Sequence, residues 1–73
     1  MKTYITFGQN HVHRVKGKTL DCDSVAVIEC NSAEEGRNKA FEYFGPRFSM
    51  EYPEQYWKED EQLKYFPRGY INI

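Results

Sequence analysis

Residues 1–73 make one domain, and a chain this short has little material for a hydrophobic core. A formal net charge of -1 argues against direct binding of nucleic acid, and no apolar run approaches the about 20 residues of a membrane span. The chain starts in a strand-like pattern, and its two cysteines do not make a disulfide framework. We therefore expect no secretion signal, no membrane contact and a reducing, cytoplasmic location.

The first half of the chain predicts two strands separated by a polar segment. Residues 3–7 are rich in β-branched and aromatic types, which favour a strand. Residues 8–23 read as a polar loop or an irregular hairpin, in which Gly17 would form the turn. Residues 24–30 are predicted to form a central strand because apolar residues occupy both of its faces. The residues of the first strand expected to face the core are Thr3, Ile5 and Phe7.

The clearest local pattern predicts a helix at 33–44. Ser32 and Glu35 match a capping box, in which each side chain would accept a hydrogen bond from the other's backbone amide. Gly45 followed by Pro46 would end the helix. Small residues four positions apart would let this helix approach a sheet closely, and they are Gly36 and Ala40.

The C-terminal third predicts two more strands. Alternation over 47–52 indicates a half-buried strand. A helical turn at 54–58 and an acidic loop at 59–61 would follow, then a turn at 67–69 and a last strand at 70–73. The residues expected on one face of the first of these strands are Phe48, Met50 and Tyr52. The predicted fold is α+β, with one helix packed on a mainly antiparallel sheet of three or four strands in β-β-α-β-β order.

An acidic and aromatic stretch at 51–66 is the strongest candidate for a binding surface. Acids spaced among rings could imitate a nucleic-acid strand and occupy a basic groove on a nucleic-acid-binding protein. The simpler alternative is that the rings are core and the acids keep the domain soluble. Tyr56 and Trp57 are adjacent, so in a regular element one of them would be exposed as an anchor. The residues predicted to bind a partner are Glu51, Glu54, Tyr56, Trp57, Glu59, Asp60 and Glu61.

A basic loop at 9–18 supports an alternative function, the binding of phosphate or a nucleotide. Arginine and lysine bind phosphate, and histidine can donate to it. The loop lacks the glycine patterns of phosphate-binding and dinucleotide-binding motifs. The residues predicted to bind the ligand in this alternative are Asn10, His11, His13, Arg14, Lys16 and Lys18.

Metal and thiol chemistry receive less support. A zinc site could be drawn from His11 and His13 with Asp21, Cys22 or Asp23, but the spacing matches no structural zinc pattern. The acids that flank Cys22 disfavour its thiolate, the reactive form. We expect no metal, no cofactor, no catalytic residue and hence no enzyme.

Five fragments of the sequence stand out together: residues 4–9 (YITFGQ), 11–13 (HVH), 26–30 (AVIEC), 33–45 (AEEGRNKAFEYFG) and 64–69 (KYFPRG). With these fragments the chain resembles small proteins encoded by bacteriophages and prophages. The resemblance implies a host-takeover or anti-defence factor, for example an anti-CRISPR inhibitor or a sponge for a signalling nucleotide. It assigns a role to no individual residue.

The expected function is therefore that of a phage-encoded, non-enzymatic protein that inhibits a host defence factor in the cytoplasm of the infected bacterium. The expected partner is a host protein, for example a nucleic-acid-binding CRISPR effector. A homodimer fits as well, because a small domain rich in rings gains stability by burying a self-complementary patch.

Overall fold

The chain folds into short strands and helices, seen in a computed structural model that describes residues 1–73 except for the side chains of Glu59 and Asp60. The elements in chain order are β1 (Lys2–Thr6), β2 (His13–Val15), β3 (Lys18–Leu20), β4 (Ser24–Glu29), α1 (Ala33–Phe44), β5 (Met50–Pro53), the 3-10 helix η1 (Glu54–Tyr56), α2 (Glu59–Gln62), the 3-10 helix η2 (Leu63–Tyr65) and β6 (Gly69–Asn72). The predicted α+β class is confirmed. The predicted β-β-α-β-β order is incomplete, because a hairpin precedes β4 and helical turns precede β6.

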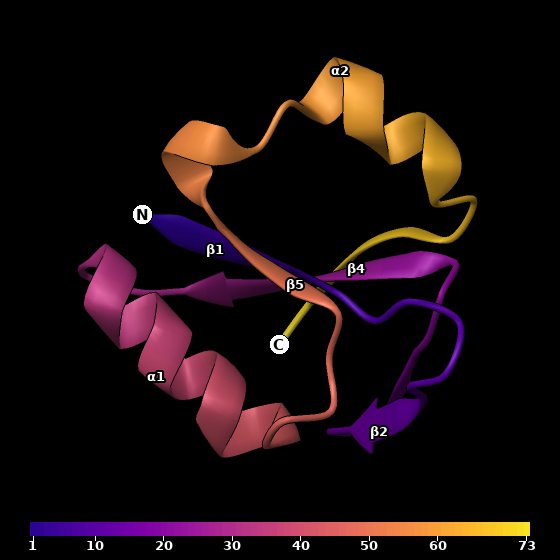
Figure 1. The fold of residues 1–73 in the computed structure, drawn as a ribbon, viewed down its shortest axis with the longest axis horizontal. Coiled ribbons are helices and arrows are strands. Elements are labelled where there is room, and N and C mark those ends of the chain that lie inside the picture. The colour runs from indigo at the N-terminus through magenta and orange to yellow at the C-terminus, as the bar shows by residue number, and fades with distance from the viewer.

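Four of the strands form one mixed sheet in the order β5-β1-β4-β6 (Figure 1). β1 pairs antiparallel with β4 and with β5, whereas β4 pairs in parallel with β6. The sheet is thus mainly antiparallel, as predicted. Its two inner strands, β1 and β4, are buried along most of their length on both faces, so each face must be covered by another layer.

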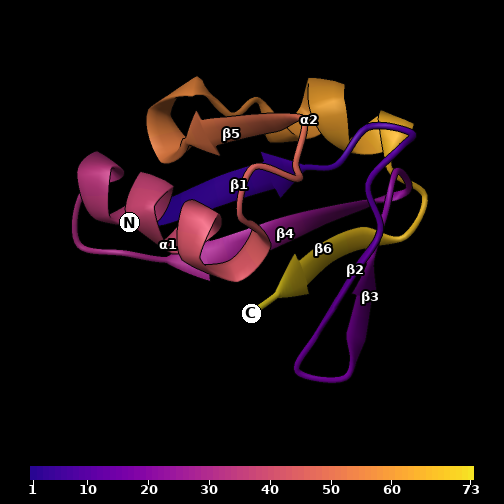
Figure 2. The same ribbon diagram turned by 60° about the horizontal axis from the view of Figure 1, so that its bottom comes forward.

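The polar segment between β1 and β4 contains the predicted hairpin. β2 and β3 pair antiparallel, with Val15 opposite Lys18. The chain reverses at Lys16 and Gly17, whose φ angles of 52° and 77° both lie in the left-handed region. Two such residues are typical of a turn that matches the twist of a hairpin. Figure 2 shows the hairpin projecting away from the four-stranded sheet.

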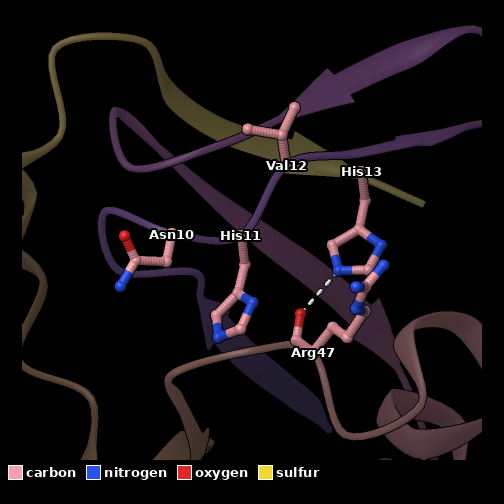
Figure 3. Close-up of a pocket in the computed structure, with 5 residues that line it drawn as sticks. All are labelled: Asn10, His11, Val12, His13 and Arg47. Atoms are coloured by element: carbon pink, nitrogen blue, oxygen red, sulfur yellow. Dashed lines mark hydrogen bonds between the residues drawn. The ribbon is translucent and has the colours of Figure 1, made fainter.

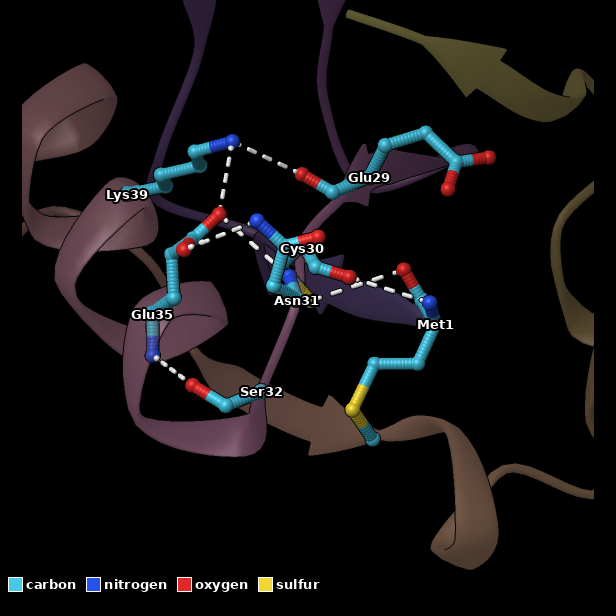
Figure 4. Close-up of polar contacts among 7 residues, drawn as sticks. All are labelled: Met1, Glu29, Cys30, Asn31, Ser32, Glu35 and Lys39. Carbon is cyan, nitrogen blue, oxygen red and sulfur yellow. Dashed lines mark hydrogen bonds and ion pairs between the residues drawn. The ribbon is translucent and has the colours of Figure 1, made fainter.

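Helix α1 begins and ends where its local sequence indicates. The Ser32 hydroxyl accepts a hydrogen bond from the Glu35 amide at 3.1 Å (Figure 4). The returning bond differs from the prediction, because the Glu35 carboxylate accepts from the amide of Asn31 at 3.3 Å rather than from that of Ser32. At the other end, Gly45 has a φ of 60° and its amide donates to the carbonyl of Phe41 at 2.8 Å.

The face of α1 that meets the sheet is built from small residues and one large ring. Gly36 and Ala40 are buried, and a Cβ atom at Gly36 would lie 3.0 Å from both the Cys30 Sγ and the Thr3 Cβ. Such close approach explains why the helix carries glycine at this position. Further along, Phe44 packs edge-on against Phe7, with ring centroids 5.0 Å apart.

The opposite face of the sheet is covered by residues 54–66, which we call the outer layer. Figure 1 shows α1 below the strands and the outer layer above them. Trp57 is its main contact with the sheet: its ring stacks on Tyr4 with centroids 5.0 Å apart and an interplanar angle of 8°. Its Nε1 donates to the Tyr70 hydroxyl at 2.8 Å. The domain therefore has three layers, where a helix on one face of the sheet was predicted.

Two predictions for the C-terminal third are wrong in detail. β5 starts at Met50 rather than at residue 47, so strand alternation does not extend back to Phe48. Phe48 instead packs near Phe44 of α1, whereas Tyr52 contacts Trp57 on the other face. Met50 is 50% exposed. The segment 59–61, predicted as a loop, lies in the helical turn α2.

Candidate functional sites

The two adjacent rings of the outer layer, Tyr56 and Trp57, differ in exposure: one faces solvent and the other packs on the sheet. Trp57 is only 8% exposed, whereas Tyr56 is 64% exposed. The prediction that Trp57 binds a partner is therefore wrong, because its ring is core and its indole nitrogen is already hydrogen-bonded to Tyr70. Exposed tyrosines are common anchors at protein interfaces, so of the two adjacent rings only Tyr56 is a candidate anchor.

The predicted acidic residues divide between two sides of the sheet. Glu54 and Glu61 are exposed on the outer layer with Tyr56. Glu51 lies in β5 and accepts a hydrogen bond from the hydroxyl of Thr3, a residue that faces α1. Glu51 therefore does not belong to the outer layer surface. The remaining two predicted acids, Glu59 and Asp60, have side chains outside the described part of the structure.

Part of the predicted basic loop lines a pocket of about 240 Å³ (Figure 3). Its lining residues are Asn10, His11, Val12, His13 and Arg47. The Nε2 of His13 lies 2.5 Å from the carbonyl oxygen of Arg47, and since a carbonyl only accepts, Nε2 carries the proton. In Figure 3 the His11 ring lies between the Asn10 side chain and the main chain of Arg47. We call this site the His-Arg pocket.

The other predicted ligand residues lie elsewhere on the hairpin. The Lys16 ammonium lies 5.5 Å from the ring centroid of Tyr43, and that of Lys18 donates to the carbonyl of Asn72 at 2.6 Å. Arg14 is exposed in β2, where alternation points its side chain away from the face of His13. These three cations do not line the His-Arg pocket, so the predicted basic loop is not one site.

Sequence reasoning missed Arg47 as a pocket residue. Thirty-four positions separate it from His13, and no motif links the two. The only local signal was that Arg47 follows the Gly-Pro pair that ends α1, where the chain must turn. The turn is closed by a hydrogen bond from the Arg47 amide to the carbonyl of Phe44 at 3.2 Å.

A second pocket, of about 570 Å³, lies beside the same segments and was not predicted. Its lining includes polar groups from Gln9, Asp23 and Ser49 and the rings of Tyr65 and Phe66. This volume falls in the range typical of small-molecule sites. We call it the ring pocket.

The geometry gives no support to thiol or metal chemistry. Desolvation and the neighbouring carboxylates of Asp23 and Asp21 raise the pKa of the Cys22 thiol, and a thiol is unreactive while protonated. The Asp21 carboxylate is paired with Arg68 at 2.8 Å. Among the described residues, no three or more His, Cys, Asp or Glu side chains are grouped so that they could hold a metal ion.

Comparisons with known proteins return no relative: no protein-family model, curated protein or solved structure matches the chain. Within the part of the chain that the structure describes, no helix combines the length and the apolar character needed to cross a membrane. The fold and its surfaces define a small three-layer α+β domain whose outer layer exposes acids and tyrosines, with the His-Arg pocket and the ring pocket among its surface pockets.

Proposed function

We propose that this chain is a non-enzymatic binding protein that blocks a protein partner through the exposed surface of its outer layer. The observation that carries the proposal is the 64% exposure of Tyr56 on the same short layer as the exposed acids Glu54 and Glu61. Burying a tyrosine within a ring of polar contacts is how many interfaces obtain most of their affinity. The acids select a basic partner and speed association with it.

The partner class that fits this surface is a nucleic-acid-binding protein. Its basic groove would accept carboxylates in place of phosphates, and an aromatic ring in place of a base. The resemblance to small phage proteins supports a host defence effector, for example a CRISPR effector, in the cytoplasm of an infected bacterium. Inhibition then requires only that the groove be occupied.

The test is capture of the partner by the tagged chain from a lysate of defence-competent bacteria at physiological salt. We expect a stoichiometric protein that the variant Glu54→Lys/Tyr56→Ala/Glu61→Lys fails to retain. Capture should also weaken as ionic strength rises, because salt screens exposed charges.

A matched control carries the same charge change on the other side of the sheet. Glu34→Lys/Glu42→Lys alters two exposed acids of α1, and we expect it to retain the partner. Circular dichroism of both variants should show that they remain folded. Equal retention by both, or equal loss from both, would contradict the assignment to the outer layer.

A further inference from the structure

The ring pocket lies at one end of the four-stranded sheet, where the outer layer meets the strands. Thr6 ends β1, Asp23 precedes β4 and Ser49 precedes β5, and antiparallel pairing brings these positions to the same end of the sheet. Tyr65 and Phe66 come from η2 and the residue after it, within the outer layer. The pocket therefore borders the outer layer surface described above.

A buried hydroxyl opens onto this pocket. Thr6 is only 8% exposed, yet no described residue shares a hydrogen bond with its hydroxyl. No described buried side-chain oxygen or nitrogen is both sealed from solvent and without a partner, so this hydroxyl reaches the pocket that Thr6 lines. A polar group of this kind costs free energy unless solvent or a ligand meets it. The Thr6 hydroxyl is therefore a ready partner for a ligand in the pocket.

The charge of the ring pocket is negative. Asp23 is the one charged residue among those described in its lining. Its Oδ1 lies 3.7 Å from the Sγ of Cys22, which is itself a lining residue, so the carboxylate lies at the pocket wall. The neighbouring Asp21 is paired with Arg68, whereas the ion pairs of the described residues leave Asp23 without a cation. A carboxylate in this position favours a positively charged ligand.

The rings of the pocket suit a flat cation. Tyr65 is 69% exposed, and the Lys64 ammonium lies 5.2 Å from the centroid of its ring. Lys64 does not line the pocket, so it leaves the pocket side of the ring open. Phe66 adds apolar area that can cover an aliphatic stem. An arginine guanidinium stacks on aromatic rings and donates several hydrogen bonds in its plane, so it can meet a ring and a carboxylate together.

We propose that the ring pocket binds the side chain of an arginine from the basic partner. The guanidinium pairs with the Asp23 carboxylate, stacks beside Tyr65 and donates to the Thr6 hydroxyl. This inference rests on the proposed function, because the arginine belongs to the same partner. It adds a specific anchor to a surface that is otherwise defined by exposed acids and Tyr56.

The test is a titration into the millimolar range, followed by backbone amide NMR. The ligands are acetyl-Gly-Arg-Gly-amide and the same peptide with citrulline or lysine in the centre. We expect the arginine peptide to shift the amides of residues 6–9, 22–23, 49 and 65–66. It should bind about tenfold or more tightly than the citrulline peptide, which has the same shape and no charge. The lysine peptide should also bind more weakly, because a compact ammonium does not stack on a ring.

Two matched pairs of variants locate the site. Asp23→Asn should weaken binding of the arginine peptide about tenfold or more, whereas Glu54→Gln removes the same charge from outside the pocket and should not. Tyr65→Ala should weaken binding about threefold or more, whereas Tyr56→Ala should not. All four side chains are exposed, so we expect the variants to fold.

Thr6→Val separates binding from folding. The change removes a hydroxyl with which no described residue shares a hydrogen bond, and valine is favoured in a strand. The melting temperature should therefore not fall. The arginine peptide should nevertheless bind about threefold or more weakly, because one hydrogen bond is lost.

Three results of the titration would overturn the inference. One is equal affinity for the arginine and citrulline peptides, which would remove the charge from recognition. Another is equal weakening by Asp23→Asn and Glu54→Gln, which would indicate diffuse attraction to an acidic surface. The third is equal affinity for the arginine and lysine peptides, which would remove the stacking on Tyr65.

Capture from the lysate distinguishes this inference from the proposed function. A partner that Asp23→Asn retains as well as the wild type does would overturn the arginine anchor and leave the outer layer surface in place. Peptide binding without any captured protein would instead contradict the proposed function, and the pocket would then be a site for a free guanidinium compound.

Discussion

The two faces of the sheet are buried in different ways. On the α1 side, a regular helix of 12 residues covers a cluster of buried residues that includes Ile5, Phe7 and Ala26. On the other side, helical turns of three and four residues cover Tyr4, Val25 and Val27 mainly through the indole of Trp57, beside which Phe66 packs partly buried. A regular helix distributes its burial over several positions at helical spacing. The irregular outer layer instead concentrates most of its burial in one large ring, that of Trp57.

Because so much of the burial on this side falls on Trp57, this side chain should contribute more to stability than any other in the outer layer. A buried aromatic side chain removes about 150–250 Å² from water, which stabilises the fold by roughly 4–6 kcal/mol at 25 cal/mol per Å². Domains of this size have a total stability of only about 5–15 kcal/mol. Loss of the one ring should therefore affect the whole domain, whereas the α1 side can tolerate loss of a single contact better.

The largest expected effect comes from Trp57→Ala. We expect this change to lower the free energy of unfolding by about 3–5 kcal/mol, because it removes the stack on Tyr4 and leaves a cavity. Urea denaturation followed by circular dichroism measures the change. The neighbouring Tyr56→Ala is the control and should stay within about 0.5 kcal/mol of the wild type, since its ring is exposed. Similar losses for both variants would show that the two rings are not on opposite sides.

A smaller effect is expected on the α1 side from Gly36→Val. The added side chain would meet the Cys30 Sγ and the Thr3 Cβ at 3.0 Å, so the helix must shift away from the sheet. Overpacking of this kind costs about 1–3 kcal/mol. Asn38→Val places the same residue on the exposed side of α1 and should change stability by less than about 0.5 kcal/mol. If thermal unfolding ranks the two variants the other way, α1 does not lie so close to β1.

The smallest effect concerns the pH dependence of stability at the start of α1. The Lys39 ammonium, and then the Asn31 amide, lower the pKa of Glu35 below its ordinary value. A carboxylate with a lowered pKa in the folded state stabilises the fold above its ordinary pKa. That stabilisation is lost as the pH falls through the lowered pKa. We therefore expect wild type and Glu35→Gln to differ at neutral pH and to converge in acid, as followed by melting temperature.

Glu34→Gln serves as the control for this pH dependence. Glu34 is an exposed carboxylate in the same turn of α1. The Glu34→Gln variant should keep the loss of stability in acid that Glu35 causes. A wild type and a Glu35→Gln variant whose stabilities run in parallel from neutral to acidic pH would contradict the role of the contacts around Glu35.

The features predicted well from sequence are those that depend on nearby residues. Helix α1 is one of them, because its cap at Ser32, its small residues and its Gly45 stop all lie within 14 positions of one another. The hairpin turn at Gly17 and the central strand β4 also depend on local pattern. The parallel pairing of β4 with β6 does not, because its partner residues Ser24 and Gly69 are far apart in the chain.

The features that were missed depend on distant contacts. Trp57 is buried because Tyr4 and Tyr70 form its site, and neither lies near it in sequence. Arg47 was missed for the same reason, because its place in the His-Arg pocket depends on His13 of the hairpin. A pattern of acids and rings therefore identified the segment 51–66 as unusual but could not tell which ring was core.

The most direct test of this arrangement is the fluorescence of Trp57, which is the only tryptophan in the chain. Emission and acrylamide quenching should be recorded for the native protein and again in denaturant. A buried indole stacked on Tyr4 predicts native emission at shorter wavelength than in denaturant, with strong protection from the quencher. Native emission and quenching equal to those of the unfolded chain would contradict the account, because Trp57 would then lie on the surface and the outer layer would lack its core.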